Sequence, residues 1–433
     1  MVWESFRTIP SLLQNPVNSG PAPGQPPAWN ATNYTRPFNL DLTSKHPAGL
    51  NEAFSSPLID QNRKYVRYQL QLNEVLYAFI RANKWYLKGN LPKSPTVAGL
   101  PPLPLDKDGK IINQQQPQTN TVVEQPVNGN SITIKSAWRI MIETPDPLKP
   151  WEQKDDLSRY FVSEAIISDP VTGEESTTSQ KVGLVGLHIV VKTPQFSQGI
   201  WASFEHVDNL STPALSNKRP SFNKGDGTFY PSGFSYQPPA ITSDQDAVPE
   251  SRRTPVEVSR IYKIPDTPVA KSPCFPQGLS TRGMNKTYRK LLEGTVWQNY
   301  QLVITQWPTD PTSFYAKPFL YPRGFDEKPP ADQPPAVQKA YDRAMSNAKN
   351  AYPRWSGLPI PQVGALNTTM ETYFQNPGDH QSLENTSCMG CHYGASDTDY
   401  FWALKLRTWP QPYNQGRIYL SDSVKARKPA HTE

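Results

Sequence analysis

The chain has 433 residues, of which 44 are Lys or Arg and 38 are Asp or Glu, so its formal net charge is +6. Its 47 prolines are about twice the average frequency, yet it also has 11 Trp, 20 Tyr and 16 Phe, too many large aromatic side chains for a disordered polymer. This composition excludes collagen, a coiled coil and a bundle of membrane helices, and it predicts a packed body with long proline-rich loops.

The basic residues are scattered along the chain rather than grouped in a run, so the sequence lacks the charge pattern of a nucleic-acid-binding protein. The mild positive charge is compatible with an acidic partner that docks weakly on one face. No apolar stretch is long enough to cross a bilayer, so we expect no membrane span.

The first third of the chain predicts an arm, one helix and one strand. Residues 1–57 are rich in Pro, Asn and Ser with little periodicity, and we expect an extended arm that lies on the body. Apolar residues at i, i+3 and i+4 spacing predict a helix over 61–87, followed by a polar loop at about 89–128. Alternation of apolar and polar residues over 132–142 then predicts a half-buried strand.

The middle of the chain predicts a sheet. Residues 182–192 are apolar on both faces, as in a central strand, and residues 199–207 read as a second strand that the short connection places in a hairpin or crossover. After a loop-rich stretch, 210–258, a helix is expected at 284–293 with Gly294 as its stop signal. A further strand is expected at 296–306 and a helix at about 335–350.

The C-terminal part predicts short helices around a turn. We expect a helix at 368–375, a loop, a cysteine-containing turn and a helix from about 397 to 408. Together these elements predict an α+β fold with a β-dominated body, peripheral helices and a helical C-terminal segment. We divide the chain into an arm (1–57), a β-rich body (58–325) and a C-terminal segment packed on that body (326–433).

Two predicted strands carry polar residues that are candidates for acid–base catalysis. His188 lies within the apolar strand, and Glu205 and His206 end the next one. Glu205 or His206 at a sheet edge would be placed to act on a bound substrate. The alternative is that such a histidine is a hydrogen-bonded core residue, and the facing of His188 and His206 depends on the strand register.

The most specific signal is the run Cys388-Met389-Gly390-Cys391-His392, which is the Cys-x-x-Cys-His attachment signature of c-type haem. Two thiols three residues apart project from one side of a helical turn, where each can add to one vinyl group of the porphyrin. The histidine that follows then reaches one axial position of the iron.

Two other interpretations of the cysteines compete with haem attachment. A thioredoxin-like dithiol needs a strand before the motif, whereas residues 375–380 read as a loop. A zinc site formed by Cys274, Cys388, Cys391 and His392 has suitable ligand types but lacks a second paired spacing. Outside such a site, Cys274 between Pro273 and Pro276 reads as a lone buried thiol.

At these residues the sequence resembles the c-type cytochromes. The flanking runs 367–375 and 397–402 are similar to large bacterial mono-haem cytochrome-like proteins of no assigned function. The resemblance implies one covalent haem c, Cys388 and Cys391 as thioether attachment points and His392 as the proximal iron ligand. It also implies maturation in the periplasm or outside the cell. We therefore expect that a signal peptide was removed, although the N-terminus shows none.

The second axial ligand departs from the pattern of small cytochromes, in which a methionine follows the motif. The residues after His392 include no methionine and a single histidine, His431. Met389 sits inside the attachment turn and is sterically excluded. Met370 on the expected helix and His380 in the loop before the motif are the upstream candidates, and an open or water-bound iron position is the alternative.

Three functions are compatible with a haem in this chain. The first is electron transfer, with a redox protein or a small molecule as donor or acceptor. The second is a haem-dependent oxidoreductase of peroxidase or oxygenase type with an open distal iron site, which the size of the chain favours. The third is a binding or structural β-domain whose haem holds its C-terminus together.

Overall fold

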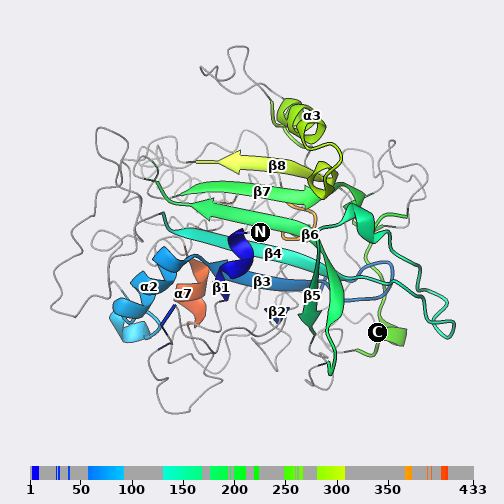
Figure 1. The fold of residues 1–433 in the computed structure, drawn as a ribbon, viewed down its shortest axis with the longest axis horizontal. Coiled ribbons are helices and arrows are strands. Elements are labelled where there is room, and N and C mark those ends of the chain that lie inside the picture. Colours follow the sequence, from blue (N-terminus) through cyan, green and yellow to red (C-terminus); the bar gives the residue numbers. More distant parts are fainter. Residues whose placement is uncertain are drawn as a thin grey trace, which may run out of the picture.

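A computed structural model describes residues 2–8, 26, 28–29, 38–39, 57–91, 130–167, 176–193, 196, 199–210, 219–223, 248–258, 260, 263–266, 280–307, 366–372, 388, 392 and 401–407. These residues form one large β-sheet with α-helices at its edges (Figure 1). The predicted β-dominated body with peripheral helices is thereby confirmed.

Within the described ranges the sheet has eight strands, and neighbouring strands run in the order β1-β3-β4-β6-β5-β2, with β7 paired to β6 and β8 paired to β7. All pairs are antiparallel except β2 with β5. The strands are β1 (Arg7–Thr8), β2 (Phe38–Asn39), β3 (Arg67–Leu72), β4 (Ile132–Ile140), β5 (Val162–Ile166), β6 (Gln180–Val191), β7 (Ile200–His206) and β8 (Tyr300–Gln306).

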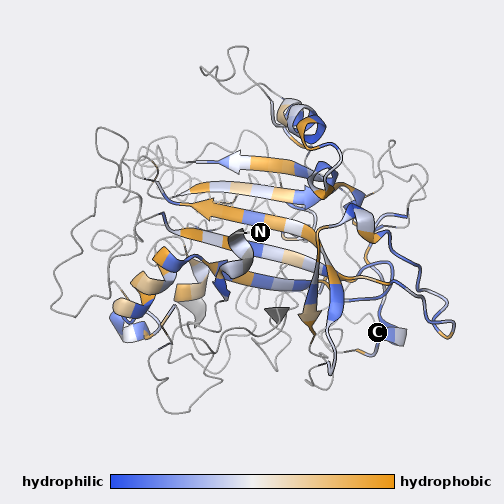
Figure 2. Cartoon of the chain, viewed as in Figure 1, coloured by the Kyte–Doolittle hydropathy of each residue, from blue (hydrophilic) through white to orange (hydrophobic). Residues whose placement is uncertain are grey.

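Three strand predictions are confirmed because their side-chain patterns match their places in the sheet. The strand β6 pairs with β4, β5 and β7, and hydrophobic residues run along much of its length (Figure 2). It continues into β7 as an antiparallel hairpin in which Val191 faces Ile200. The strand expected at 132–142 is β4. The strand expected at 296–306 begins later, since residues Val296–Asn299 form a 3-10 helix before β8.

The helix predicted over 61–87 is wrong in its first half. Residues 67–72 form strand β3, which pairs with β4, and only Glu74–Ala82 form the helix α2. Asn73 separates the two elements, because its side-chain oxygen accepts hydrogen bonds from the backbone N–H of Leu76 at 3.2 Å and of Ile132 at 3.1 Å. An N-cap of this kind fixes where the helix begins.

The other helix predictions have mixed outcomes. The helix α3 (Thr281–Leu291) begins at Ser280, whose hydroxyl caps Gly283, and the chain then turns at Gly294 with a φ of 82°. The helix α7 (Trp402–Arg407) lies within the range expected at 397–408 and beside α2 (Figure 1). The described part of the helix expected at 368–375 is instead a turn. The helix expected at 335–350 lies outside the described residues.

The two faces of the sheet bury different clusters. We call the face that carries Gly186, His188, Trp201 and Glu205 the motif face; strand alternation and the pairing of β6 with β7 place these side chains on one side. The opposite face buries Trp138, Leu184 and Tyr300 with other apolar residues, and the N-terminal residues Trp3 and Phe6 pack on it. Both faces are therefore covered, and most of the residues discussed below lie on the motif face.

Candidate haem-attachment site

Two residues of the Cys-x-x-Cys-His motif are described, and both contact the sheet. Cys388 and His392 are helical, so their spacing of four residues places them on the same side of one turn. Cys388 packs against Val303 and Ile304 of β8. The imidazole of His392 lies 4.3 Å from the indole of Trp201 on β7, measured between ring centroids, with the planes tilted by 54°. Cys391 lies outside the described residues.

These contacts place the motif over two neighbouring strands of the sheet. β7 pairs with β8, with Trp201 opposite Gln306 and Ser203 opposite Ile304. The platform under the motif is therefore apolar and aromatic, and Trp201 itself is only 6% exposed. Cys388 and His392 are half-buried.

The described residues fit a covalently attached haem. A porphyrin needs an apolar wall, thiols on one side of a helical turn and an adjacent imidazole, and Cys388, His392 and the β7–β8 platform meet these needs in part. Within the described ranges no group of three or more His, Cys, Asp or Glu side chains could hold a metal ion. The zinc and dithiol interpretations both depend on Cys391, and the zinc site also on Cys274, which is likewise outside the described residues.

The chain leading to the motif is held on the same face by residues 366–372. The Asn367 side-chain oxygen accepts from the N–H and the hydroxyl of Thr369, at 2.9 and 2.8 Å, which makes a turn rather than a helix. The Asn367 amide donates to the carbonyl of Phe204 on β7 at 2.7 Å, and the hydroxyl of Tyr68 on β3 donates to the carbonyl of Thr369 at 2.7 Å. These bonds anchor the segment across the sheet.

Glu205, one of the two catalytic candidates, is buried at 2% exposure and fully engaged. One carboxylate oxygen contacts the Arg260 guanidinium and accepts from Gln301 at 2.9 Å, while the other accepts from the Thr368 hydroxyl at 2.8 Å. Arg260 also donates to the carbonyl of Leu366 at 3.2 Å. The structure thus gives Glu205 the contacts of a group that fastens residues 366–372 to β7.

His206, the other candidate, has the contacts of a core histidine. Its ring stacks on Tyr160 at 4.0 Å and is fully buried. Its Nδ1 accepts from the Asp208 N–H at 3.1 Å, so Nε2 carries the proton and donates to the carbonyl of Arg159 at 2.9 Å. Burial lowers the pKa of His206 to about 4, so the ring is neutral near pH 7. Adjacent strand residues face opposite sides, so Glu205 and His206 do not act together.

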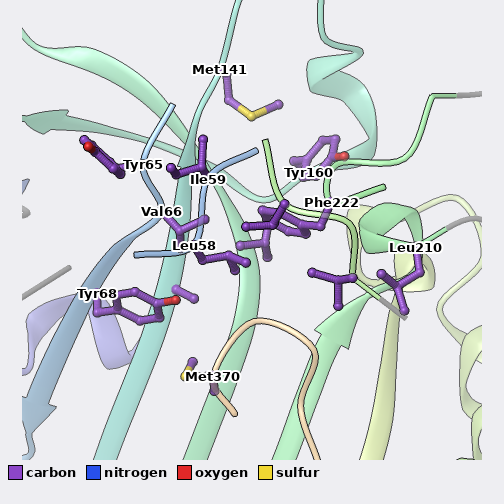
Figure 3. Close-up of a cluster of buried hydrophobic side chains, with 14 residues drawn as sticks. Leu58, Ile59, Tyr65, Val66, Tyr68, Met141, Tyr160, Leu210, Phe222 and Met370 are labelled. Carbon is purple, nitrogen blue, oxygen red and sulfur yellow. The ribbon is translucent and has the colours of Figure 1, made fainter. Parts of the chain in front are cut away.

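Met370, a candidate for the second iron ligand, is fully buried in a hydrophobic cluster with Leu58, Tyr68 and Phe222 (Figure 3). The same cluster contains Ala137 of β4, which pairs with Gly186 of β6, whereas Trp201 of β7 pairs with Val190, four residues further along β6. Ordinary strand geometry therefore separates the Cα atoms of Ala137 and Trp201 by roughly 16 Å. The structure does not bring Met370 and His392 together. The other candidate, His380, lies outside the described residues.

His188 lies on the motif face between Gly186, which pairs with Ala137 of the Met370 cluster, and Val190, which pairs with Trp201. Its Nε2 lies 3.4 Å from a carboxylate oxygen of Glu371, and this buried nitrogen makes no hydrogen bond within the part of the chain that the structure describes. Burial raises the pKa of Glu371, but the nearby charges of His188 and Lys135 and the N–H of Asn367 outweigh it and lower that pKa overall. The only sequence signal for this pair is a histidine within an otherwise apolar strand.

Comparison with known proteins gives this chain no relatives: no protein-family model, curated protein or solved structure matches it. In the ranges that the structure describes, no helix is both long and apolar enough to cross a membrane.

Proposed function

We propose that the protein is a mono-haem c-type cytochrome that transfers electrons through one haem c attached to Cys388 and Cys391, with His392 as the proximal iron ligand. The observation that carries this proposal is the Cys-x-x-Cys-His spacing, supported by the helical placement of Cys388 and His392 over β7 and β8. When bound, such a haem supplies a reversible one-electron couple between Fe(II) and Fe(III).

The described residues beside the motif have separate parts in this proposal. Val303 and Ile304 exclude water from one side of Cys388, and the indole of Trp201 limits rotation of the His392 ring. The half-buried state of Cys388 and His392 leaves a partner room to approach the motif. Because haem c is attached outside the cytoplasm, we place the protein in the periplasm or outside the cell, with a redox protein or a small molecule as its donor or acceptor.

A second candidate function is a haem-dependent oxidoreductase of peroxidase or oxygenase type with an open distal site. Met370 is buried in a core cluster whose Ala137 lies roughly 16 Å from Trp201, and this position favours the alternative over methionine ligation. Rapid binding of CO to the reduced protein would support it, because CO needs a free iron position.

The experiment is production of the chain in a bacterial host that attaches haem to exported cytochromes, followed by the pyridine haemochrome spectrum and the intact mass. We expect one haem that acid acetone does not extract. The variants Cys388→Ala and Cys391→Ala should weaken the linkage, and the double variant should lose it, whereas Cys274→Ala is the matched control and should retain haem. A colourless wild-type protein without the mass increase of haem would contradict the proposal.

A further inference from the structure

We infer that His188 is the second axial ligand of the haem iron, opposite His392. This inference rests on the proposed function and names a residue of the same site that the sequence pattern did not assign. It is carried by a juxtaposition on the motif face: a histidine whose buried ring nitrogen makes no hydrogen bond among the described residues lies one strand away from the tryptophan that contacts His392.

The register of the hairpin sets the separation of the two positions. Trp201 on β7 is paired with Val190 on β6, and His188 is two residues further along β6 on the same face. Ordinary strand geometry therefore puts the Cα atoms of Trp201 and His188 about 8 Å apart.

Two axial imidazoles of one iron must lie close together. Each metal–imidazole bond is about 2 Å, so the two ligating nitrogens are about 4 Å apart and the ring centres about 6 Å apart. The ring of His392 lies 4.3 Å from that of Trp201, and His188 is two residues along the neighbouring strand from the partner of Trp201, on the same face. The two histidines are therefore both placed near Trp201 on the motif face.

One ring nitrogen of His188 makes an ion-pair contact but, within the described ranges, no hydrogen bond. Its Nε2 has no hydrogen-bond partner among the described residues, and Glu371 at 3.4 Å is its nearest anionic neighbour. The other carboxylate oxygen of Glu371 accepts from the Asn367 N–H at 2.9 Å, so this carboxylate keeps one hydrogen bond when the imidazole turns away. Turning the imidazole from Glu371 toward a metal gives up the ion pair, and Glu371 then keeps the Asn367 N–H and the nearby charge of Lys135.

The competing described side chains are occupied elsewhere. Both ring nitrogens of His206 are hydrogen-bonded to the backbone, and its side chain points away from the motif face. Met370 is buried in the core cluster. His188 is thus the described histidine that combines position on the motif face with an available nitrogen.

The test uses the haem-loaded full chain and the absorption and electron paramagnetic resonance spectra of its ferric form. We expect a low-spin spectrum in the wild type and its replacement by a high-spin spectrum in His188→Ala, with the covalent haem retained and CO binding gained in the reduced form. Added imidazole should restore the low-spin spectrum of His188→Ala. Met370→Leu, which keeps the core volume, is the control and should remain low-spin.

Three results would overturn the inference while leaving the haem assignment intact. They are a high-spin wild type, a low-spin His188→Ala, and loss of the low-spin spectrum in Met370→Leu. If His188→Ala does not fold, the wild type alone decides, because the weak near-infrared absorption band of a sulfur–iron bond would exclude two nitrogen ligands. Absence of covalent haem from the wild type would instead refute the proposed function itself.

Discussion

The contact between Gly186 on β6 and Thr369 offers a direct test of how residues 366–372 lie on the sheet. A Cβ at Gly186 would approach the Thr369 hydroxyl more closely than the 3.0 Å that real Cβ atoms essentially never pass, with the Asn367 amide oxygen at 3.3 Å and Ala137 at 3.5 Å. Gly186 does not have a positive φ, so its backbone conformation alone would accept alanine. The clash with Thr369 is therefore the reason for glycine at this position.

The expected free energies follow from this geometry. Gly186→Ala should destabilise the protein by about 1–3 kcal/mol, the usual cost of overpacking a well-filled site. Thr369→Ala should cost about 1 kcal/mol for its hydrogen bond to Asn367. In the Thr369→Ala background the clash is removed, and Gly186→Ala should be near neutral, because the gain of about 0.5–1 kcal/mol for alanine over glycine in a strand is offset by the tight contact that remains with Asn367 at 3.3 Å.

The measurement is a double-mutant cycle by urea unfolding with tryptophan fluorescence. A coupling free energy of about 1–3 kcal/mol is expected between the two sites. Gly89→Ala is the matched control, because a Cβ there meets nothing within 4 Å. If Gly186→Ala costs the same in both backgrounds, residues 366–372 do not rest on β6, and the anchoring of the motif segment described above is wrong.

Three further predictions concern individual buried groups. Asn73→Ala should destabilise the protein by about 1–2 kcal/mol in urea unfolding, because it removes the cap of α2; an unchanged midpoint would refute the capping role. Glu205→Ala should cost about 3–5 kcal/mol, because the half-buried Arg260 loses its ion-pair partner and Gln301 and Thr368 lose their acceptor; full stability with altered redox behaviour would instead favour a catalytic role. The pKa of His206 falls from 6.5 to about 4 on folding, so the unfolded chain binds the extra proton in this range and stability is lost as the pH falls through it. Between pH 7 and 5 the wild type should lose about 2 kcal/mol more than His206→Asn, and equal losses would show that the ring is not held neutral.

The sheet could be predicted from the sequence where burial imposes a clear period. The apolar run of β6 and the alternation in β4 reflect their central places, and these strands were predicted within a few residues. The 61–87 region was harder, because Leu72 and Leu76 fit one helical face although Leu72 belongs to β3. Pairing of β3 with β4 across an intervening 59 residues decides the matter, and no local pattern carries that information.

Some features of the candidate site could be predicted from the local sequence, and others depend on strands that are distant in the sequence. The spacing of Cys388 and His392 predicts that they share one helical turn, because the helical period is a local property. Their contacts with Trp201 and Ile304 could not be predicted, since they join the motif to strands far away in the sequence. The facing of His188 also depends on a distant cause, the register between β6 and its neighbours, which shifts at a bulge beside Ala137.

The placement of the C-terminal residues gives the large β-rich body a physical purpose. Cys388 packs against residues of β8, and His392 contacts Trp201 of β7. Thr369 lies against Gly186 of β6, and α7 packs with Leu72 of β3. The described parts of the C-terminal segment therefore contact strands across the width of the sheet. A short cytochrome domain encloses its haem with its own helices, whereas here the wall beside the motif is a preformed sheet. If an iron site forms there, strand register would set the positions of β7 and β8 beneath Cys388 and His392.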